Sequence, residues 1–143
     1  MEKILVSACL LGEACRYDAG SKPCPRVIAL KEKYELIPVC PEQAGGLPTP
    51  RTPSEIVGER VLMKDGTDVT ENYKKGAEYA LHLAKENNCT VAVLKEKSPS
   101  CGKGLIHNGR FDGGMTEGNG ITTALLTAHG ITVLGESEIE ELM

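Results

Sequence analysis

A chain of 143 residues, with 41% hydrophobic and 25% charged residues, has the size and composition of a soluble globular protein, and we expect residues 1–143 to form a single domain. The formal net charge of -4 and the scarcity of aromatic residues (four Tyr, one Phe and no Trp) argue against unaided binding to nucleic acid, which requires a basic face and stacking rings. The chain opens without a signal-peptide pattern and has no apolar run long enough to span a bilayer, so we expect a cytoplasmic protein with no membrane partner.

The apolar patterns of the chain predict an α/β fold. Short apolar runs indicate strands at 3–9, 35–40, 90–94 and 131–134. Helical patterns fall at 26–33, 70–87, 121–129 and 136–143, with Thr70 as the N-cap of the longest helix. This alternation predicts a mostly parallel, open, Rossmann-like sheet flanked by helices and joined by right-handed crossovers.

Three further stretches interrupt the alternation. Residues 41–53 are too rich in Pro and Gly for regular structure, and a loop of this length in a compact domain is more often functional than idle. Residues 60–64, followed by Asp65-Gly66, predict a small hairpin inserted before the longest helix. A glycine-rich segment at 102–120 follows the third strand.

Cysteines close three of the four predicted strands: Cys9, Cys40 and Cys101. One free cysteine is commonly just a small buried hydrophobe. Three at the carboxyl ends of parallel strands, where open α/β sheets bind their ligands, indicate a shared site. In a reducing compartment six cysteines also favour metal or thiol chemistry over disulfides. Of the other three cysteines, Cys24 and Cys89 are expected to be structural. The role of Cys15 is left open.

More than one inorganic centre suits three distant thiolates. Structural zinc usually takes four ligands that include close Cys pairs, and the chain has no C-x-x-C or H-x-x-x-H pair. Catalytic zinc with three protein ligands is a second option. An iron–sulfur cluster is bound by thiolates, and three of them on a four-iron cluster leave one iron free to accept a soft, sulfur-bearing ligand.

Six segments of the chain carry a family resemblance: Ser7-Ala-Cys-Leu-Leu-Gly12, Cys15-Arg-Tyr-Asp18, Pro38-Val-Cys-Pro-Glu42, Gly45-Gly-Leu-Pro-Thr-Pro-Arg51, Ser98-Pro-Ser-Cys-Gly102 and Gly118-Asn-Gly-Ile-Thr122. Together, and in this order over nearly the whole chain, they resemble the thiouracil desulfidase family. The resemblance implies a [4Fe-4S] cluster held by three cysteines and the non-redox release of sulfur from thiouracil, giving uracil and sulfide. One departure is Ala19, where relatives commonly have Gly.

Carried over residue by residue, the resemblance implies a set of site residues. The cluster ligands would be Cys9, Cys40 and Cys101, and the candidate acid/base residues would be Glu42 and Ser98. Glu42 stands two residues after Cys40, where a carboxyl group beside a negatively charged cluster can pass protons near neutral pH. Ser98 would contact the pyrimidine or relay a proton, or else serve only the turn before a proline.

Further polar residues of these motifs are candidates for binding a small thiolated pyrimidine. Ser7 belongs to this group. Arg16 and Arg51 either bind a carbonyl or anionic group of the substrate or only support their loops. Gly118 and Asn119 precede a predicted helix and could present backbone N–H groups. Because the chain is acidic and has no added domain of the kind found in relatives that act on tRNA, a free base or nucleoside is the expected substrate.

Two other functions compete with this interpretation. The first is a zinc-binding structural or regulatory module without catalysis. The second is a thiol-redox protein that uses Cys9 and Cys15, although this pair lacks the C-x-x-C context that lowers a thiol pKa. His107 is expected to be an ordinary surface histidine.

Overall fold

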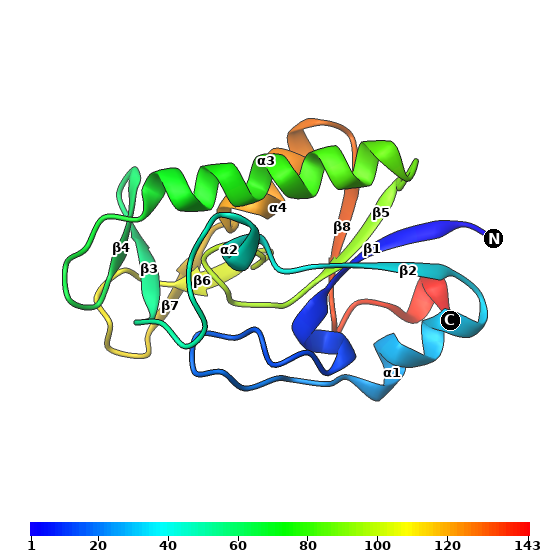
Figure 1. Cartoon of the computed structure of the whole chain (residues 1–143), viewed down its shortest axis with the longest axis horizontal. Coiled ribbons are helices and arrows are strands. Elements are labelled where there is room, and N and C mark those ends of the chain that lie inside the picture. Colours follow the sequence, from blue (N-terminus) through cyan, green and yellow to red (C-terminus); the bar gives the residue numbers. More distant parts are fainter.

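A four-stranded parallel sheet forms the centre of the computed structural model, which describes all 143 residues (Figure 1). The strand order is β2-β1-β5-β8, and every neighbouring pair is parallel. The bounds of these strands are β1 (Lys3–Ser7), β2 (Glu35–Val39), β5 (Val91–Leu94) and β8 (Thr132–Gly135). The predicted α/β class with a mostly parallel sheet is therefore confirmed.

Helices cover both faces of the sheet (Figure 1). On one face lie α3 (Thr70–Glu86) and α4 (Ile121–Ala128); on the other lie α1 (Pro25–Ile28) and three 3-10 turns, η1 (Ala8–Leu11), η2 (Ala29–Glu32) and η3 (Glu140–Leu142). Successive residues of β1 point to opposite faces, as the pleat requires. Leu5 packs in the cluster beneath α3 and α4, whereas Ile4 and Val6 pack in the cluster with α1.

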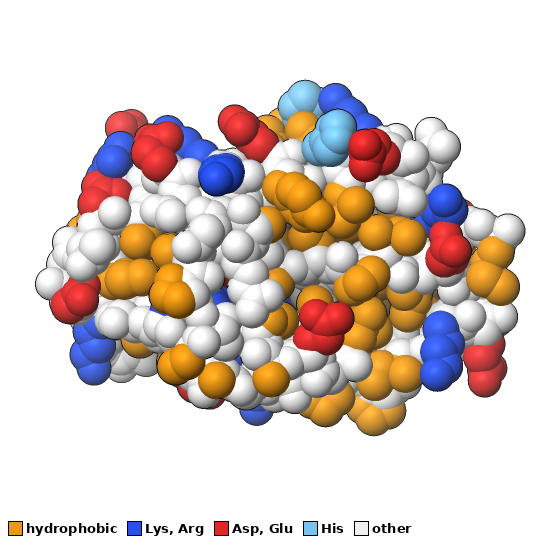
Figure 2. Space-filling model, viewed as in Figure 1, with side chains coloured by type: hydrophobic (Ala, Val, Ile, Leu, Met, Phe, Trp, Pro, Cys, Tyr) orange, Lys and Arg blue, Asp and Glu red, His pale blue; other side chains and the backbone are white.

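Edge strand β2 is one border of the sheet. Figure 2 shows apolar side chains gathered beside α3 and β2 on the face seen there. Pro38 lies within β2 and has no N–H group, which is tolerated because only one side of an edge strand is paired.

No helix in the structure combines the length and the apolar character needed to cross a membrane.

Two hairpins lie together beyond one end of the sheet (Figure 1). One is β3 (Ser54–Val57) with β4 (Arg60–Met63), and the other is β6 (Leu105–His107) with β7 (Met115–Glu117). The predicted turn at Asp65-Gly66 is confirmed: the Met63 N–H donates to the Thr67 carbonyl oxygen at 2.8 Å, and Leu62 pairs with Asp68 in antiparallel fashion across it. The turn between β3 and β4 is Gly58-Glu59, where Gly58 adopts a φ of 61°. The second hairpin was not predicted, because glycine-rich segments carry little strand signal.

Several helix predictions need correction. The helix predicted at 26–33 is one α-helical turn followed by η2, and the one predicted at 136–143 is reduced to η3. Thr70 is the first residue of α3 and not its N-cap: its hydroxyl accepts a hydrogen bond from the Val61 N–H, and Asp68 Oδ1 accepts the Thr70 N–H. Within the predicted loop 41–53 there is one short helix, α2 (Pro41–Ala44).

Candidate active site

A cavity of about 390 Å³ opens at the carboxyl end of the sheet. Four cysteines line it: Cys9, Cys15, Cys40 and Cys101. Cys9 lies in η1 directly after β1, and Cys40 is the residue between β2 and α2. The structure therefore brings the three predicted ligands together and adds Cys15 to them. Cys24 and Cys89 do not line this cavity and pack in the two apolar clusters that flank the sheet.

The turn that carries Cys101 is held by its own first residue. Ser98 Oγ accepts hydrogen bonds from the N–H groups of Ser100 (3.0 Å) and Cys101 (3.1 Å). Ser98 also lines the cavity, so its side chain serves the turn and still borders the site. Since both bonds use the oxygen as acceptor, the hydroxyl hydrogen remains free to donate.

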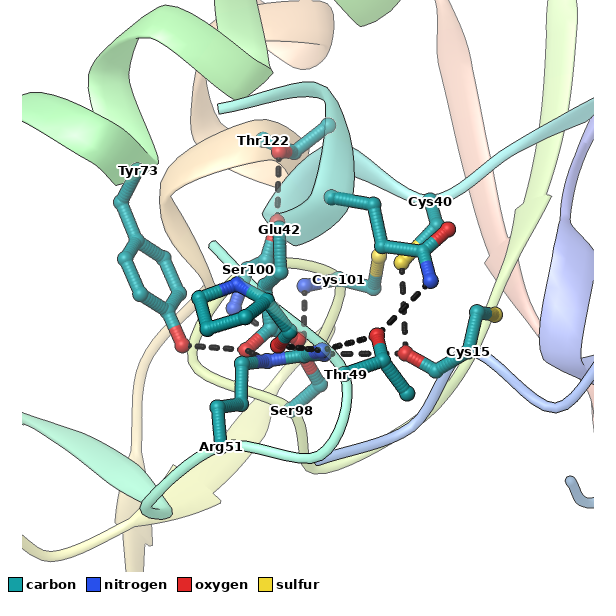
Figure 3. A network of polar contacts seen from close by, with 12 residues as sticks. Cys15, Cys40, Glu42, Thr49, Arg51, Tyr73, Ser98, Ser100, Cys101 and Thr122 are labelled. Atoms are coloured by element: carbon teal, nitrogen blue, oxygen red, sulfur yellow. Dashed lines mark hydrogen bonds and ion pairs between the residues drawn. The ribbon is translucent and has the colours of Figure 1, made fainter. Parts of the chain in front are cut away.

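The start of α4 fixes the same turn from the other side. The N–H groups of Ile121 and Thr122 donate to the carbonyl oxygens of Pro99 and Ser100, each at 2.9 Å. This contact requires Gly120, because a Cβ there would lie 2.4 Å from the Ser100 carbonyl oxygen. The hydroxyl groups of Ser100 and Thr122 add a buried hydrogen bond of 2.7 Å, drawn in Figure 3.

The two residues predicted to offer backbone N–H groups to the substrate, Gly118 and Asn119, do not line the cavity. Asn119 Oδ1 accepts the N–H of Gly104 at 2.8 Å, and the N–H of Gly118 donates to the Gly104 carbonyl oxygen at 3.1 Å. The segment thus secures the chain that follows Cys101. Gly118 and Asn119 therefore belong to the family motif because they support the turn that carries Cys101.

Glu42 projects from the first turn of α2 toward α3 (Figure 3). Its Oε1 atom accepts a hydrogen bond from the Tyr73 hydroxyl at 2.5 Å and lies 3.4 Å from Arg51 Nε. Its Oε2 atom makes no hydrogen bond within the protein. Tyr73 is 1% exposed, and burial followed by the Glu42 charge raises the pKa of its phenol, so the hydroxyl stays a donor.

Two glycines allow this approach of α2 to α3. A Cβ on Gly76 would lie 1.9 Å from the Pro41 carbonyl oxygen, and a Cβ on Gly45 would lie 2.0 Å from that of Asn72. Neither contact leaves space for a side chain. Tyr73 was missed in the sequence, although it lies one helical turn before Gly76 and Ala77 on the buried side of the helix.

Arg51 is 2% exposed in its side chain and acts within the protein. Its guanidinium donates to the carbonyl oxygens of Pro48 (3.1 Å) and Cys15 (3.0 Å), and to Thr49 Oγ1 (3.0 Å). With the contact to Glu42 this occupies most of its donors. Of the two roles considered for Arg51, these contacts favour support of the loop and of the carboxylate.

Arg16 and Ser7 also line the cavity. Arg16 lies 3.9 Å from Asp18 and over the Tyr17 ring, 5.7 Å from its centroid. Ser7 is 3% exposed, and its Oγ accepts the Lys95 N–H at 2.9 Å, which ties the end of β1 to the end of β5. This contact favours a positioning role for Ser7.

Burial and contacts between the cysteines together raise the pKa of three thiols of the site. Burial raises the pKa of Cys101 to about 12, while contact with Ser7 opposes the shift. Contact with the Cys15 thiol and then burial raise the pKa of Cys40. For Cys15, contact with Cys40 lowers the pKa, but the Cys9 thiol and burial outweigh it and raise the value to about 11. Without a metal centre these groups are thiols at neutral pH, so binding one must displace their protons.

Three further residues of the cavity lining were not proposed as site residues from the sequence: Glu55, His107 and Phe111. Glu55 is a buried carboxylate that accepts the N–H groups of Gly109 (2.9 Å) and Phe111 (3.2 Å), which joins the two hairpins. His107 is not a surface histidine: it borders the cavity, and its Nδ1 atom is buried without a hydrogen-bond partner. These roles depend on hairpin contacts that no local pattern reveals.

Comparison with known proteins identifies the family. The family model described as 2-thiouracil desulfurase matches residues 4–138. The chain belongs to the 2-thiouracil desulfurase family. Its relatives include the uncharacterized protein YbbK of Bacillus subtilis (strain 168), which is 40% identical over 98% of this chain and 99% of its own length. A solved structure, the [4Fe-4S]-dependent thiouracil desulfidase TudS, superposes with a TM-score of 0.94 at 51% identity, covering 99% of this chain and 95% of the other.

The cysteine arrangement in this member of the 2-thiouracil desulfurase family suits a centre larger than one ion. No three His, Cys, Asp or Glu side chains lie close enough together to hold a single metal ion. A zinc ion draws its sulfur ligands to about 2.3 Å, which would crowd them around one point. Four cysteines line one cavity, and thiolates are the usual ligands of a multi-iron cluster.

The raised pKa of Cys101 predicts how the stability of the cluster-free protein depends on pH. A thiol whose folded pKa of about 12 exceeds the value of 9.0 for an unperturbed group contributes stability below pH 9 that is lost between pH 9 and 12. We expect the Tm of cluster-free protein to fall from pH 8 to pH 10, and to fall less in Cys101→Ala. Equal slopes in thermal unfolding of the two proteins would contradict this assignment.

Proposed function

We propose that this protein is a [4Fe-4S]-dependent desulfidase that removes sulfur from a thiolated pyrimidine, as a free base or nucleoside, by hydrolytic and non-redox chemistry. The observation that carries the proposal is the convergence of Cys9, Cys40 and Cys101 on one cavity that Glu42 also lines. The family and the name of the TudS structure support the same activity. A cavity of about 390 Å³ is within the range of small-molecule sites.

The cluster would be held by Cys9, Cys40 and Cys101. When bound through three cysteines, it supplies a Lewis-acidic iron for the thiocarbonyl sulfur. Basic side chains outnumber acidic ones in the lining, which suits an anionic centre; the basic ones are Arg16, Arg51, Lys64, Lys95 and Lys97, and the acidic ones are Glu42, Glu55 and Glu96. Cys15 contacts the thiols of Cys9 and Cys40 and stays outside the proposed ligand set.

Glu42 is the proposed acid/base residue. Tyr73 and Arg51 both hold Oε1, which fixes the carboxylate and leaves Oε2 to exchange protons. Oε2 takes a proton from the water that adds to the thiocarbonyl carbon, and returns it to the departing sulfur. The balance is C=S + H₂O → C=O + H₂S, in which one water replaces the sulfur and no electrons are gained or lost.

Ser98 is the proposed contact for the pyrimidine. Its oxygen is occupied by two backbone N–H groups, so the hydroxyl can only donate to the ligand. Ring oxygen and nitrogen atoms of a pyrimidine are suitable acceptors. Serving the turn and contacting the substrate are therefore compatible roles for one side chain.

The activity itself is tested with cluster-loaded protein under anaerobic conditions. We expect 2-thiouracil or 4-thiouracil to yield sulfide and uracil in equal amounts without added oxidant or reductant, because the reaction is a hydrolysis. Protein that carries a full cluster and releases no sulfide from either compound would refute the proposal.

The ligand assignment predicts a specific pattern among cysteine variants. Cys9→Ser, Cys40→Ser and Cys101→Ser should each lose the visible absorption and the bound iron of the cluster, because each removes one of three thiolates. Cys89→Ser and Cys24→Ser are matched controls outside the cavity and should keep both. Loss of iron in a control, or its retention in Cys40→Ser, would contradict the assignment.

Replacement of the carboxylate tests the role of Glu42. Glu42→Gln should keep the cluster spectrum and slow sulfide release by about 10²- to 10⁴-fold, the usual contribution of a general acid/base residue. Tyr73→Phe removes only the donor to Oε1 and should slow turnover by a smaller factor at unchanged KM. Unaltered turnover in Glu42→Gln would remove this residue from the mechanism.

A further inference from the structure

Phe111 is the single phenylalanine of the chain, and it lines the active-site cavity from the loop between β6 and β7. We propose that its ring is the stacking surface for the pyrimidine, an inference that rests on the proposed function and adds to it the residue that selects a flat, aromatic substrate. Stacking on an aromatic side chain is a common way to bind a base, since every base has a π-face.

The cavity offers few other surfaces for this purpose. Besides Phe111, Tyr17 has the only six-membered aromatic ring in the lining. Arg16 already stacks on that ring, 5.7 Å from its centroid. Tyr17 is also 40% exposed, at the outer part of the site. No cationic side chain stacks on the Phe111 ring, so a ligand that stacks there would displace none.

The backbone at Phe111 is held in a conformation that a bulky residue avoids. Its φ is 54°, in the left-handed region that favours glycine and asparagine. Glycines occupy positions 109 and 113 in the same loop, both with positive φ, yet the chain carries a large aromatic residue at 111. Strained residues of this kind persist where surrounding contacts fix them, and they concentrate at ligand sites.

The contact that fixes Phe111 is a buried carboxylate. Glu55 is 8% exposed, and its Oε1 atom accepts the N–H groups of both Gly109 and Phe111. A Cβ at Gly109 would lie 2.6 Å from the Ile56 carbonyl oxygen, so the loop is seated closely on β3. Glu55 is therefore a positioning residue that sets where the Phe111 backbone lies beside the cavity.

This geometry allows a variant that removes the ring without harming the fold. Phe111→Asn should keep or raise the Tm, because Asn adopts left-handed φ more readily than Phe. The same variant should weaken the binding of uracil by about 5- to 150-fold, the range expected for loss of one base–aromatic stack. Uracil is the probe because it has the ring of the substrate and no sulfur to bind iron.

The measurement is anaerobic calorimetric titration of cluster-loaded protein with uracil, together with the cluster absorption and Tm of each variant. Phe111→Tyr should bind uracil as wild type does, because the ring is kept. Glu55→Gln should weaken binding less than Phe111→Asn. Leu105→Ala changes an exposed side chain of β6 that lies outside the cavity lining, and it should change nothing.

Wild-type affinity in Phe111→Asn would overturn the stacking role, and so would failure of the wild-type protein to bind uracil. Loss of the cluster in Phe111→Asn would also contradict it, since the ring would then serve the metal centre. These results are separate from the test of the activity. If the protein binds uracil through Phe111 but releases no sulfide from thiouracil, the proposed reaction is refuted and the stacking role is not.

Discussion

Parallel pairing of β1 with both of its neighbours is the constraint on which the active site depends. The register that places Ser7 beside Val39 brings the residues after β1 and β2 to the same edge. Pairing of Val6 with Val93, reinforced by the Ser7–Lys95 hydrogen bond, brings the end of β5 to the same place. Because side chains alternate along a strand, a slip of one residue would reverse every face and scatter the cysteines.

Close backbone contacts between helices and turns then set the details of the site. Gly76 and Gly45 let α2 touch α3, which puts Glu42 within reach of a buried tyrosine and arginine. Gly120 lets α4 touch the turn that carries Cys101. In each case a missing side chain allows the approach, and hydrogen bonds then hold a reactive group in one position.

The sequence predicted the parts of the fold that depend on local pattern. Apolar runs predicted the four strands. The positions of Cys9, Cys40 and Cys101 after three of these strands predicted that they share one site, because topology brings the carboxyl ends of parallel strands to the same edge of the sheet. The family motifs also marked Glu42 and Ser98, which the structure places at the cavity. Their chemical roles are still proposals.

What the sequence did not predict depends on contacts between distant segments. Tyr73 is an ordinary member of an apolar helix face until α2 packs against it, and Glu55 resembles any strand carboxylate until the β6–β7 loop lies over it. Gly118 and Asn119 were expected at the ligand because a glycine-rich helix start often binds one. Here the N–H groups at this start are used by the protein's own turn.

The separation of the three cysteines along the chain has a consequence for biosynthesis. Cys101 is made well after Cys9 and Cys40, and hydrogen bonds from the start of α4 hold its turn. A nascent chain that has emerged only as far as residue 40 has two of the three proposed sulfur ligands, Cys9 and Cys40. It still lacks the turn that carries Cys101. Iron delivery to the proposed centre must therefore wait until the chain has been made at least as far as α4.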